Sequence, residues 1–139
     1  MYYNSNKNKI DNISLSLLLY LIPIFIYFYK TEIIFSTLGL CCTWSSYLYH
    51  ITNEQSKLYL YIDMFFAITT LNYLLFDLLF ITTIYIKLYF LVLVLLSFCC
   101  YIKGSGRNKT INRSVEYEKY HLLWHILLFI LSLSHSYLK

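Results

Sequence analysis

An almost uninterrupted apolar stretch of 45 residues, Leu58–Ile102, limits how this chain can fold more than any other feature of its sequence. About 20 apolar residues are needed for one helix to cross the hydrocarbon core of a bilayer. The stretch therefore has room for two spanning helices and is too short for three. We expect these helices over residues 58–76 and 84–102, joined by a turn over residues 77–83.

The composition of the whole chain agrees with a membrane environment. Of its 139 residues, 59% are hydrophobic and 13% are charged, and the mean hydropathy is +0.58. A soluble domain of this length could not hide so much apolar surface, because a small globule leaves a large share of its residues facing water. Helices satisfy their own backbone hydrogen bonds in lipid. We predict an all-α polytopic membrane bundle that forms one domain over residues 1–139.

Three further apolar runs complete the predicted bundle. A polar tail over residues 1–12 precedes a run over 13–29, which lacks the small-residue cleavage site of a signal peptide. Pro23 should kink this first helix, because proline has no backbone N–H to donate. The other expected elements are a helix over 33–50, a basic loop over 103–116 and a last helix over 117–138. The sequence thus predicts about five transmembrane helices.

The basic residues give an independent indication of topology, because Lys and Arg concentrate in cytosolic loops. In a five-helix chain, eight of the 11 basic residues fall on one side and three on the other. The first group is Lys7, Lys9, Lys57, Lys103, Arg107, Lys109, Arg113 and Lys119, and the second is Lys30, Lys87 and Lys139. We therefore expect a cytosolic N-terminus and a lumenal or extracellular C-terminus, in an endomembrane such as the ER or Golgi or in the plasma membrane. The basic loop is expected to touch anionic lipid and not nucleic acid.

The four cysteines form two adjacent pairs, Cys41-Cys42 and Cys99-Cys100, both within apolar runs. Adjacent residues on a helix point in different directions, and neither pair has CxxC spacing, so a zinc ribbon or redox motif is unsupported. We interpret all four as small buried hydrophobic residues.

Ionisable side chains within membrane helices usually face the interior of the bundle, where they pair with each other or bind an ion. His50 lies at the end of the second predicted helix and Asp63 near the start of the third. His121 and His125 lie near the start of the last helix. Because one helix separates the third from the last, these four side chains are predicted to approach the same membrane face.

Two other ionisable residues receive simpler interpretations. His135 lies about ten residues beyond His125, toward the opposite membrane face, and is interpreted as an ordinary interfacial residue. Asp77 is interpreted as a turn residue. The 16 tyrosines and 10 phenylalanines are interpreted as packing and interface anchors.

Spacing within the helices adds a chemical interpretation, because residues four apart share a helix face. Ser46 and His50 form one such pair, and His121 and His125 form another in HLLWH. An HxxxH pair can give two imidazoles to one metal, although interfacial histidines also occur at this spacing. A third histidine from a neighbouring helix would complete a three-histidine zinc site with its fourth position open to water.

Asp63 and Ser46 would complete such a centre. Asp63 could hydrogen-bond the zinc-bound water and act as general base, or it could orient a metal ligand. Ser46, one turn deeper than His50, could hold the water or a substrate carbonyl. Zinc-bound water is acidic enough to attack an amide or an ester. The predicted site therefore indicates hydrolysis.

Three short segments together resemble the CREST superfamily: SYLYH (Ser46–His50), YLYIDMFF around Asp63, and HLLWH (His121–His125). That group includes alkaline ceramidases, progestin and adiponectin receptors, and Per1-type remodellers of GPI-anchor lipids. The longer phrase YHLLWHI looks most like the ceramidase and Per1 branches.

The resemblance implies a seven-helix fold, zinc bound by His50, His121 and His125, and hydrolysis of lipid amides or esters within the membrane. Asp63 and Ser46 would lie beside the metal-bound water. Only about five helices fit in this chain, so it would be a reduced form that lacks two helices between Asp63 and His121.

Two hypotheses of different class remain. The leading one is a zinc-dependent intramembrane hydrolase of a ceramide-like lipid. The other is a non-catalytic membrane protein whose polar or metal cluster serves packing, lipid binding or membrane remodelling. A channel or transporter subunit is disfavoured, because the first and fourth helices offer few polar residues for a continuous path. Both main hypotheses imply a membrane lipid as substrate or ligand, and both leave open whether a homo-oligomer replaces the two absent helices.

Overall fold

The computed structural model of the 139-residue chain describes residues 12–52, 56–104 and 115–139. Nearly all of the predicted polar tail and most of the predicted basic loop lie outside these residues. Every regular element in the described ranges is a helix, and no strand occurs in them. The prediction of an all-α chain is confirmed for these residues.

Within the described ranges, six α-helices and one short 3₁₀ segment follow one another. They are α1 (Asn12–Leu17), η1 (Leu18–Tyr20), α2 (Leu21–Tyr29), α3 (Ile33–Ile51), α4 (Lys57–Leu78), α5 (Ile84–Gly104) and α6 (Val115–Leu138). The region predicted as one helix over 13–29 is therefore divided. Asp77 belongs to the last turn of α4, so its interpretation as a turn residue is wrong.

Pro23 explains the interruption between α1 and α2. Proline has no N–H to donate to the carbonyl four residues earlier, and its ring clashes with that carbonyl. In this chain that carbonyl belongs to Leu19, in the middle of η1. The backbone tightens into a 3₁₀ turn at this point and resumes the α conformation at Leu21.

Three helices are long and apolar enough to cross a bilayer. By length and composition these are Lys57–Leu78, Ile84–Lys103 and Lys119–Leu138, and Ile13–Tyr29 is a shorter apolar helix. The 19-residue α3, which contains serines, threonines and His50, is not among these three helices. Within the described residues, three of the five predicted crossings therefore meet the requirement for a span, which is consistent with a membrane protein.

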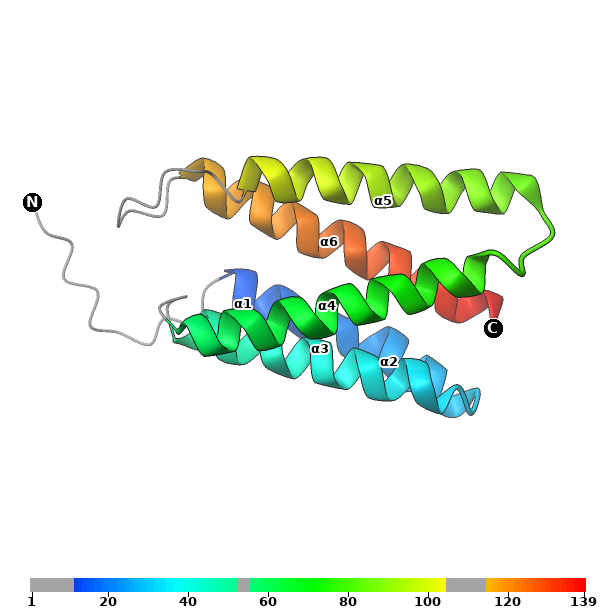
Figure 1. The fold of residues 1–139 in the computed structure, drawn as a ribbon, viewed down its shortest axis with the longest axis horizontal. Helices are drawn as coiled ribbons and strands as arrows, with labels where there is room; N and C mark the ends of the chain where they lie inside the picture. Colours follow the sequence, from blue (N-terminus) through cyan, green and yellow to red (C-terminus); the bar gives the residue numbers. More distant parts are fainter. Residues whose placement is uncertain (1–11, 53–55, 105–114) are drawn as a thin grey trace, which may run out of the picture.

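The helices lie side by side along the long axis of the molecule (Figure 1). α5 packs along α6, whereas α3 packs against both α4 and α2. The N-terminal helices α1 and α2 join these two groups, because both also contact α6. Among the described residues α4 and α5 approach each other little, although they are consecutive in the chain.

A core of apolar side chains fills the middle of the bundle. Its buried members are Tyr27, Phe35, Leu74, Leu78, Phe90, Leu93 and Leu131. Gly39 allows α3 to come close to α2, because a Cβ atom at this position would lie 2.8 Å from Cγ1 of Ile24. Two groups of polar side chains lie at opposite ends of the bundle, and the one that contains His135 contacts this core.

Candidate metal centre

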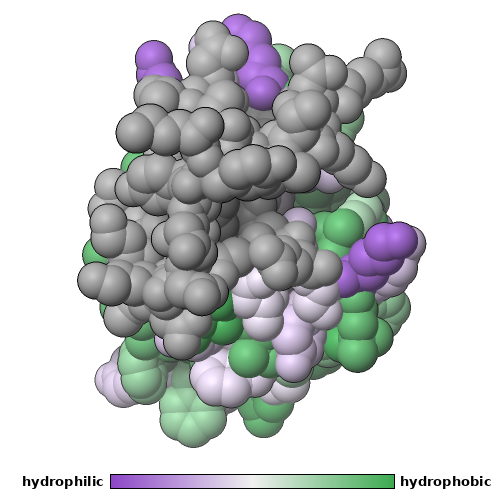
Figure 2. All heavy atoms as spheres, turned by 90° about the vertical axis from the view of Figure 1, so that its left-hand side faces the viewer, coloured by the Kyte–Doolittle hydropathy of each residue, from purple (hydrophilic) through white to green (hydrophobic). Residues whose placement is uncertain are grey.

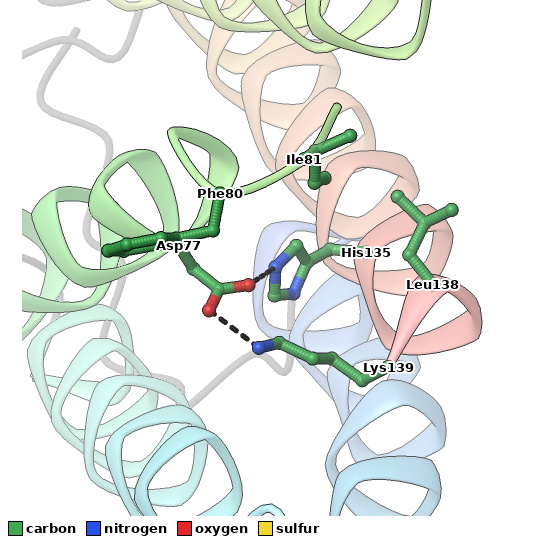
Figure 3. Close-up of a pocket in the computed structure, with 6 residues that line it drawn as sticks. All are labelled: Asp77, Phe80, Ile81, His135, Leu138 and Lys139. Carbon is green, nitrogen blue, oxygen red and sulfur yellow. Dashed lines mark hydrogen bonds and ion pairs between the residues drawn. The ribbon is translucent and has the colours of Figure 1, made fainter. Parts of the chain in front are cut away.

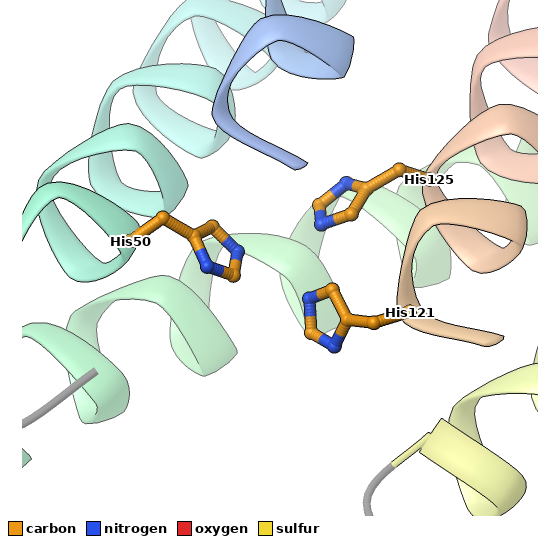
Figure 4. A group of neighbouring side chains, drawn as sticks. All are labelled: His50, His121 and His125. Atoms are coloured by element: carbon orange, nitrogen blue, oxygen red, sulfur yellow. The ribbon is translucent and has the colours of Figure 1, made fainter. Parts of the chain in front are cut away.

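Three histidines from two helices meet at one end of the bundle (Figure 4). His50 lies in the last turn of α3, and His121 and His125 lie on successive turns of α6. All three side chains are buried. One ring nitrogen from each lies within 4.8 Å of the other two. The structure thus brings together the three histidines that the sequence predicted as metal ligands.

The three rings point toward a common centre. Their centroids are 5.0 Å apart for His50 and His121, and 4.9 Å apart for His121 and His125. The ring of His50 also meets that of His125 at 5.5 Å. Neutral imidazoles are the form that binds a metal.

The donor set fits a zinc ion. Zinc prefers nitrogen and sulfur ligands in four-coordinate sites, and three histidines leave one position open. The Nε2 atom of His125 is buried and has no hydrogen-bond partner among the described residues. A buried polar atom without a partner is unfavourable by about 1–3 kcal/mol. A bound metal would give this nitrogen the partner that the protein does not provide.

Asp63 lies on α4, faces α3 and is near His50. Its side chain is largely buried, at 9% exposure. Oδ1 of Asp63 lies 3.4 Å from Oγ of Ser45, whose hydroxyl also donates to the carbonyl of Cys42 at 3.0 Å. Ser46 and His50 are close enough to interact with the same carboxyl group. Asp63 therefore connects α4 to the histidine cluster.

Both serines at this point of α3 are buried, although the sequence analysis selected only Ser46. Ser46 was selected because it lies four residues before His50, on the same helix face. Ser45 lacks this spacing to His50, so the sequence does not indicate it, although its hydroxyl also approaches Asp63. No local pattern in the sequence shows which face of a helix meets which neighbour.

Tyr20 is a further residue of the site that the sequence did not indicate. Its hydroxyl donates to the backbone carbonyl of His125 over 2.6 Å. Its ring also meets the His125 ring edge-on, with centroids 6.3 Å apart. Tyr20 is the last residue of η1, so the interruption caused by Pro23 lies directly against α6, the helix that carries His121 and His125. Tyr20 thereby fixes the position of α6 at one of the three histidines.

The end of the bundle that holds the histidines carries positive charge at its edge. Lys57 begins α4, and Lys103 and Lys119 both lie over the ring of Tyr120. Figure 2 views this end. It shows mainly hydrophobic side chains at the sides and bottom of the view, and strongly hydrophilic ones at the top and on the right. The other basic residues predicted for this side lie outside the described residues. They are Lys7, Lys9, Arg107, Lys109 and Arg113.

A second polar cluster occupies the opposite end of the bundle (Figure 3). His135 is completely buried, so its interpretation as an interfacial residue is wrong. Its Nε2 atom lies 2.9 Å from Oδ2 of Asp77, and its Nδ1 atom lies 2.7 Å from the hydroxyl of Tyr27. Lys139 forms an ion pair with the other oxygen of Asp77. These side chains connect the ends of α2, α4 and α6.

His135 faces inward because of its spacing from the site histidines. It lies 14 residues after His121, which is close to four helical turns, so both side chains are on nearly the same face of α6. Two other lysines bind backbone carbonyls at this end: Lys30 donates to Ser136 at 3.0 Å, and Lys87 donates to Leu79 at 3.2 Å. Cations at the C-terminal ends of helices are favourable, since the unpaired carbonyls are partly negative.

Comparisons of the chain with protein-family models, with curated proteins and with solved structures found no match.

Proposed function

We propose that this protein is a multi-pass membrane hydrolase that uses zinc to cleave an amide or ester bond of a membrane lipid. One observation carries the proposal: three buried imidazoles from α3 and α6 converge at one end of an apolar bundle, and the buried carboxyl group of Asp63 lies near one of them, His50. His50, His121 and His125 would hold the metal. On the motifs given above, the chain would be a reduced member of the CREST superfamily.

We also propose that the chain crosses the membrane five times, with a cytosolic N-terminus and a lumenal or extracellular C-terminus. The N-terminal helices and α3 run alongside the three helices that meet the length requirement (Figure 1). The described lysines support this path. Lys57, Lys103 and Lys119 belong to the end that holds the histidines, whereas Lys30, Lys87 and Lys139 belong to the other.

Zinc, when bound, supplies a Lewis acid that makes water nucleophilic near neutral pH. Asp63 would accept the proton that the attacking water releases, through one of its carboxyl oxygens. It would then give this proton to the nitrogen or oxygen of the leaving group as the C–N or C–O bond breaks. The water oxygen stays on the acyl carbon, so the products are a fatty acid and an amine or alcohol.

The neighbouring residues would position this acid–base group. Ser45 contacts Oδ1 of Asp63 and thereby orients the carboxyl group toward the site. Ser46, beside the same group, would hold the attacking water or the substrate carbonyl. Tyr20 holds the backbone of α6 at His125. A site held from three helices in this way supports chemistry that needs fixed geometry.

A lipid is the substrate class that fits the surroundings. The helices that carry the site are apolar on their outer faces, with Trp44 at 63% and Leu123 at 39% exposure. A soluble substrate would have to leave water to reach such a site, whereas a lipid is already at the required depth. Amide and ester lipids both present an acyl carbon near the membrane interface.

Hydrolysis by zinc-loaded protein in liposomes tests the proposal. Release of fatty acid from a ceramide-like amide and from a glycerol ester should be measured for the wild type, Asp63→Asn and Asp77→Asn. Asp63→Asn should keep its zinc and lose activity by at least about 100-fold, the range for loss of a general base. Asp77→Asn, the same change at the other end of the bundle, should stay active. Absence of hydrolysis of both lipids by folded, zinc-loaded wild type would favour a structural zinc site.

A further inference from the structure

The outer face of α4 has no partner within the described chain. α4 packs against α3 through the face that carries Asp63, and it approaches α5 little. On the opposite face Tyr61, Phe65 and Ile68 are 67%, 63% and 55% exposed. Exposed apolar side chains are expected on any helix that faces lipid. One residue in the middle of this face is not apolar.

Asn72 is that residue, and it is exposed. It lies nine residues after Asp63, which is two and a half helical turns. Its side chain therefore points away from the face that carries Asp63. It also lies 15 residues after Lys57, or about 22 Å along α4, and six residues before the end of the helix. Asn72 therefore falls within the hydrocarbon region if α4 spans the membrane.

The amide of Asn72 has two N–H donors and a carbonyl acceptor. None of these is satisfied by another described residue. Lipid tails offer no hydrogen-bond partner, and polar side chains on membrane helices commonly bond across to another helix. The position of Asn72 therefore points to a second helix outside this chain.

The spacing of the neighbouring residues defines how such a helix would pack. Alternating steps of four and three lead along the exposed face in the order Tyr61, Phe65, Ile68 and Asn72. This is the heptad spacing of a two-stranded coiled coil, in which Asn72 takes an a position. A single asparagine at an a position fixes the register and the number of helices in such a pair.

We propose that α4 is a homodimer interface in which two copies of the chain pack α4 against α4 and the two Asn72 amides hydrogen-bond each other. A second copy is the occupant that the amide favours, because a group with both donors and an acceptor is complementary to itself across a two-fold axis. All copies have the same orientation in the membrane, so the axis lies along the membrane normal and the two helices run parallel. Each Asn72 then meets its counterpart at the same depth.

Energy transfer between donor- and acceptor-labelled copies in liposomes tests this interface, with the lipid-to-protein ratio varied to obtain the dimerisation constant. Asn72→Leu should weaken dimerisation by about 3- to 30-fold, the range for polar contacts between membrane helices. Asn72→Gln, which keeps the amide, should retain more of the association. Phe98→Leu, at an exposed position of α5, should behave as the wild type. Wild-type protein that is monomeric at every ratio, or an unchanged constant for Asn72→Leu, would overturn the proposal.

Cysteine cross-linking gives a second test that leaves Asn72 in place. In a chain whose four native cysteines are replaced by alanine, Ile68→Cys should form a disulfide-linked dimer on oxidation in liposomes. Leu91→Cys, at an exposed position of α5, should not. Equal cross-linking at the two positions would show that association does not use α4.

Discussion

The imidazole rings of His50 on α3 and His125 on α6 meet edge to face, with centroids 5.5 Å apart and planes at 72°. Over the described residues the backbones of these two helices approach each other little. The histidines are therefore the direct contact between α3 and α6 at this end of the bundle, where α1 and η1 also contact both helices. A metal held between them would join these two helices directly.

Zinc removal should therefore lower the stability of the folded bundle. A ligand that binds only the folded state stabilises it by about 2.7 kcal/mol when its free concentration is 100 times Kd. We expect the thermal unfolding midpoint in detergent to fall by several degrees after chelation and to recover when zinc is added. His125→Ala should show no response to either treatment. An unfolding midpoint of the wild type that changes neither on chelation nor on addition of zinc would contradict this expectation.

Ser45→Ala should reduce hydrolysis while zinc stays bound. Hydrogen bonds to charged groups contribute about 1.5–3 kcal/mol, which corresponds to a loss of roughly 10- to 100-fold in kcat/KM if the contact operates in the transition state. Ser36→Ala is the matched control, because Ser36 is buried on the same helix and bonds only to the carbonyl of Ile33. Equal activities for the two variants would exclude Ser45 from the site.

Tyr27→Phe should destabilise the protein without affecting metal binding. The substitution removes the hydroxyl that lies 2.7 Å from Nδ1 of His135 and leaves this buried nitrogen unsatisfied. The free energy of unfolding should fall by about 1–3 kcal/mol, as measured by denaturation in detergent. Tyr29→Phe is the control, because Tyr29 is 88% exposed, and this substitution should change the free energy of unfolding little. Equal effects of the two substitutions would mean that the hydroxyl of Tyr27 does not stabilise the folded protein.

Glycosylation tests the proposed orientation. The basic loop contains two N-x-S/T acceptor sequences, Asn108-Lys109-Thr110 and Asn112-Arg113-Ser114. If this loop is cytosolic, neither asparagine acquires a glycan when the chain is made in a eukaryotic cell. An acceptor sequence on a flexible tag placed after Lys139 should be glycosylated. A glycan at Asn108 or Asn112 would show that this loop is lumenal or extracellular, and would contradict the proposed orientation.

The sequence predicts the helices and the convergence of the three histidines for simple physical reasons. Apolar runs must be helical in lipid, and alternating crossings return the ends of α3 and the starts of α4 and α6 to one face. Ser45, Tyr20 and the pair of His135 with Asp77 could not be predicted in this way. Their contacts depend on how each helix is rotated against its neighbours, and this rotation is set by tertiary packing that has no local signature.

Metal analysis of the purified protein tests the central claim most directly. Detergent-purified wild type, His125→Ala and His135→Gln should be compared for zinc content under non-chelating conditions, after each is shown to be folded by circular dichroism. We predict about one zinc ion per chain in the wild type, little in His125→Ala, and wild-type content in His135→Gln, whose altered residue lies at the other end of α6. Folded wild type without stoichiometric metal, or His125→Ala that keeps it, would contradict the metal centre and the hydrolase built on it.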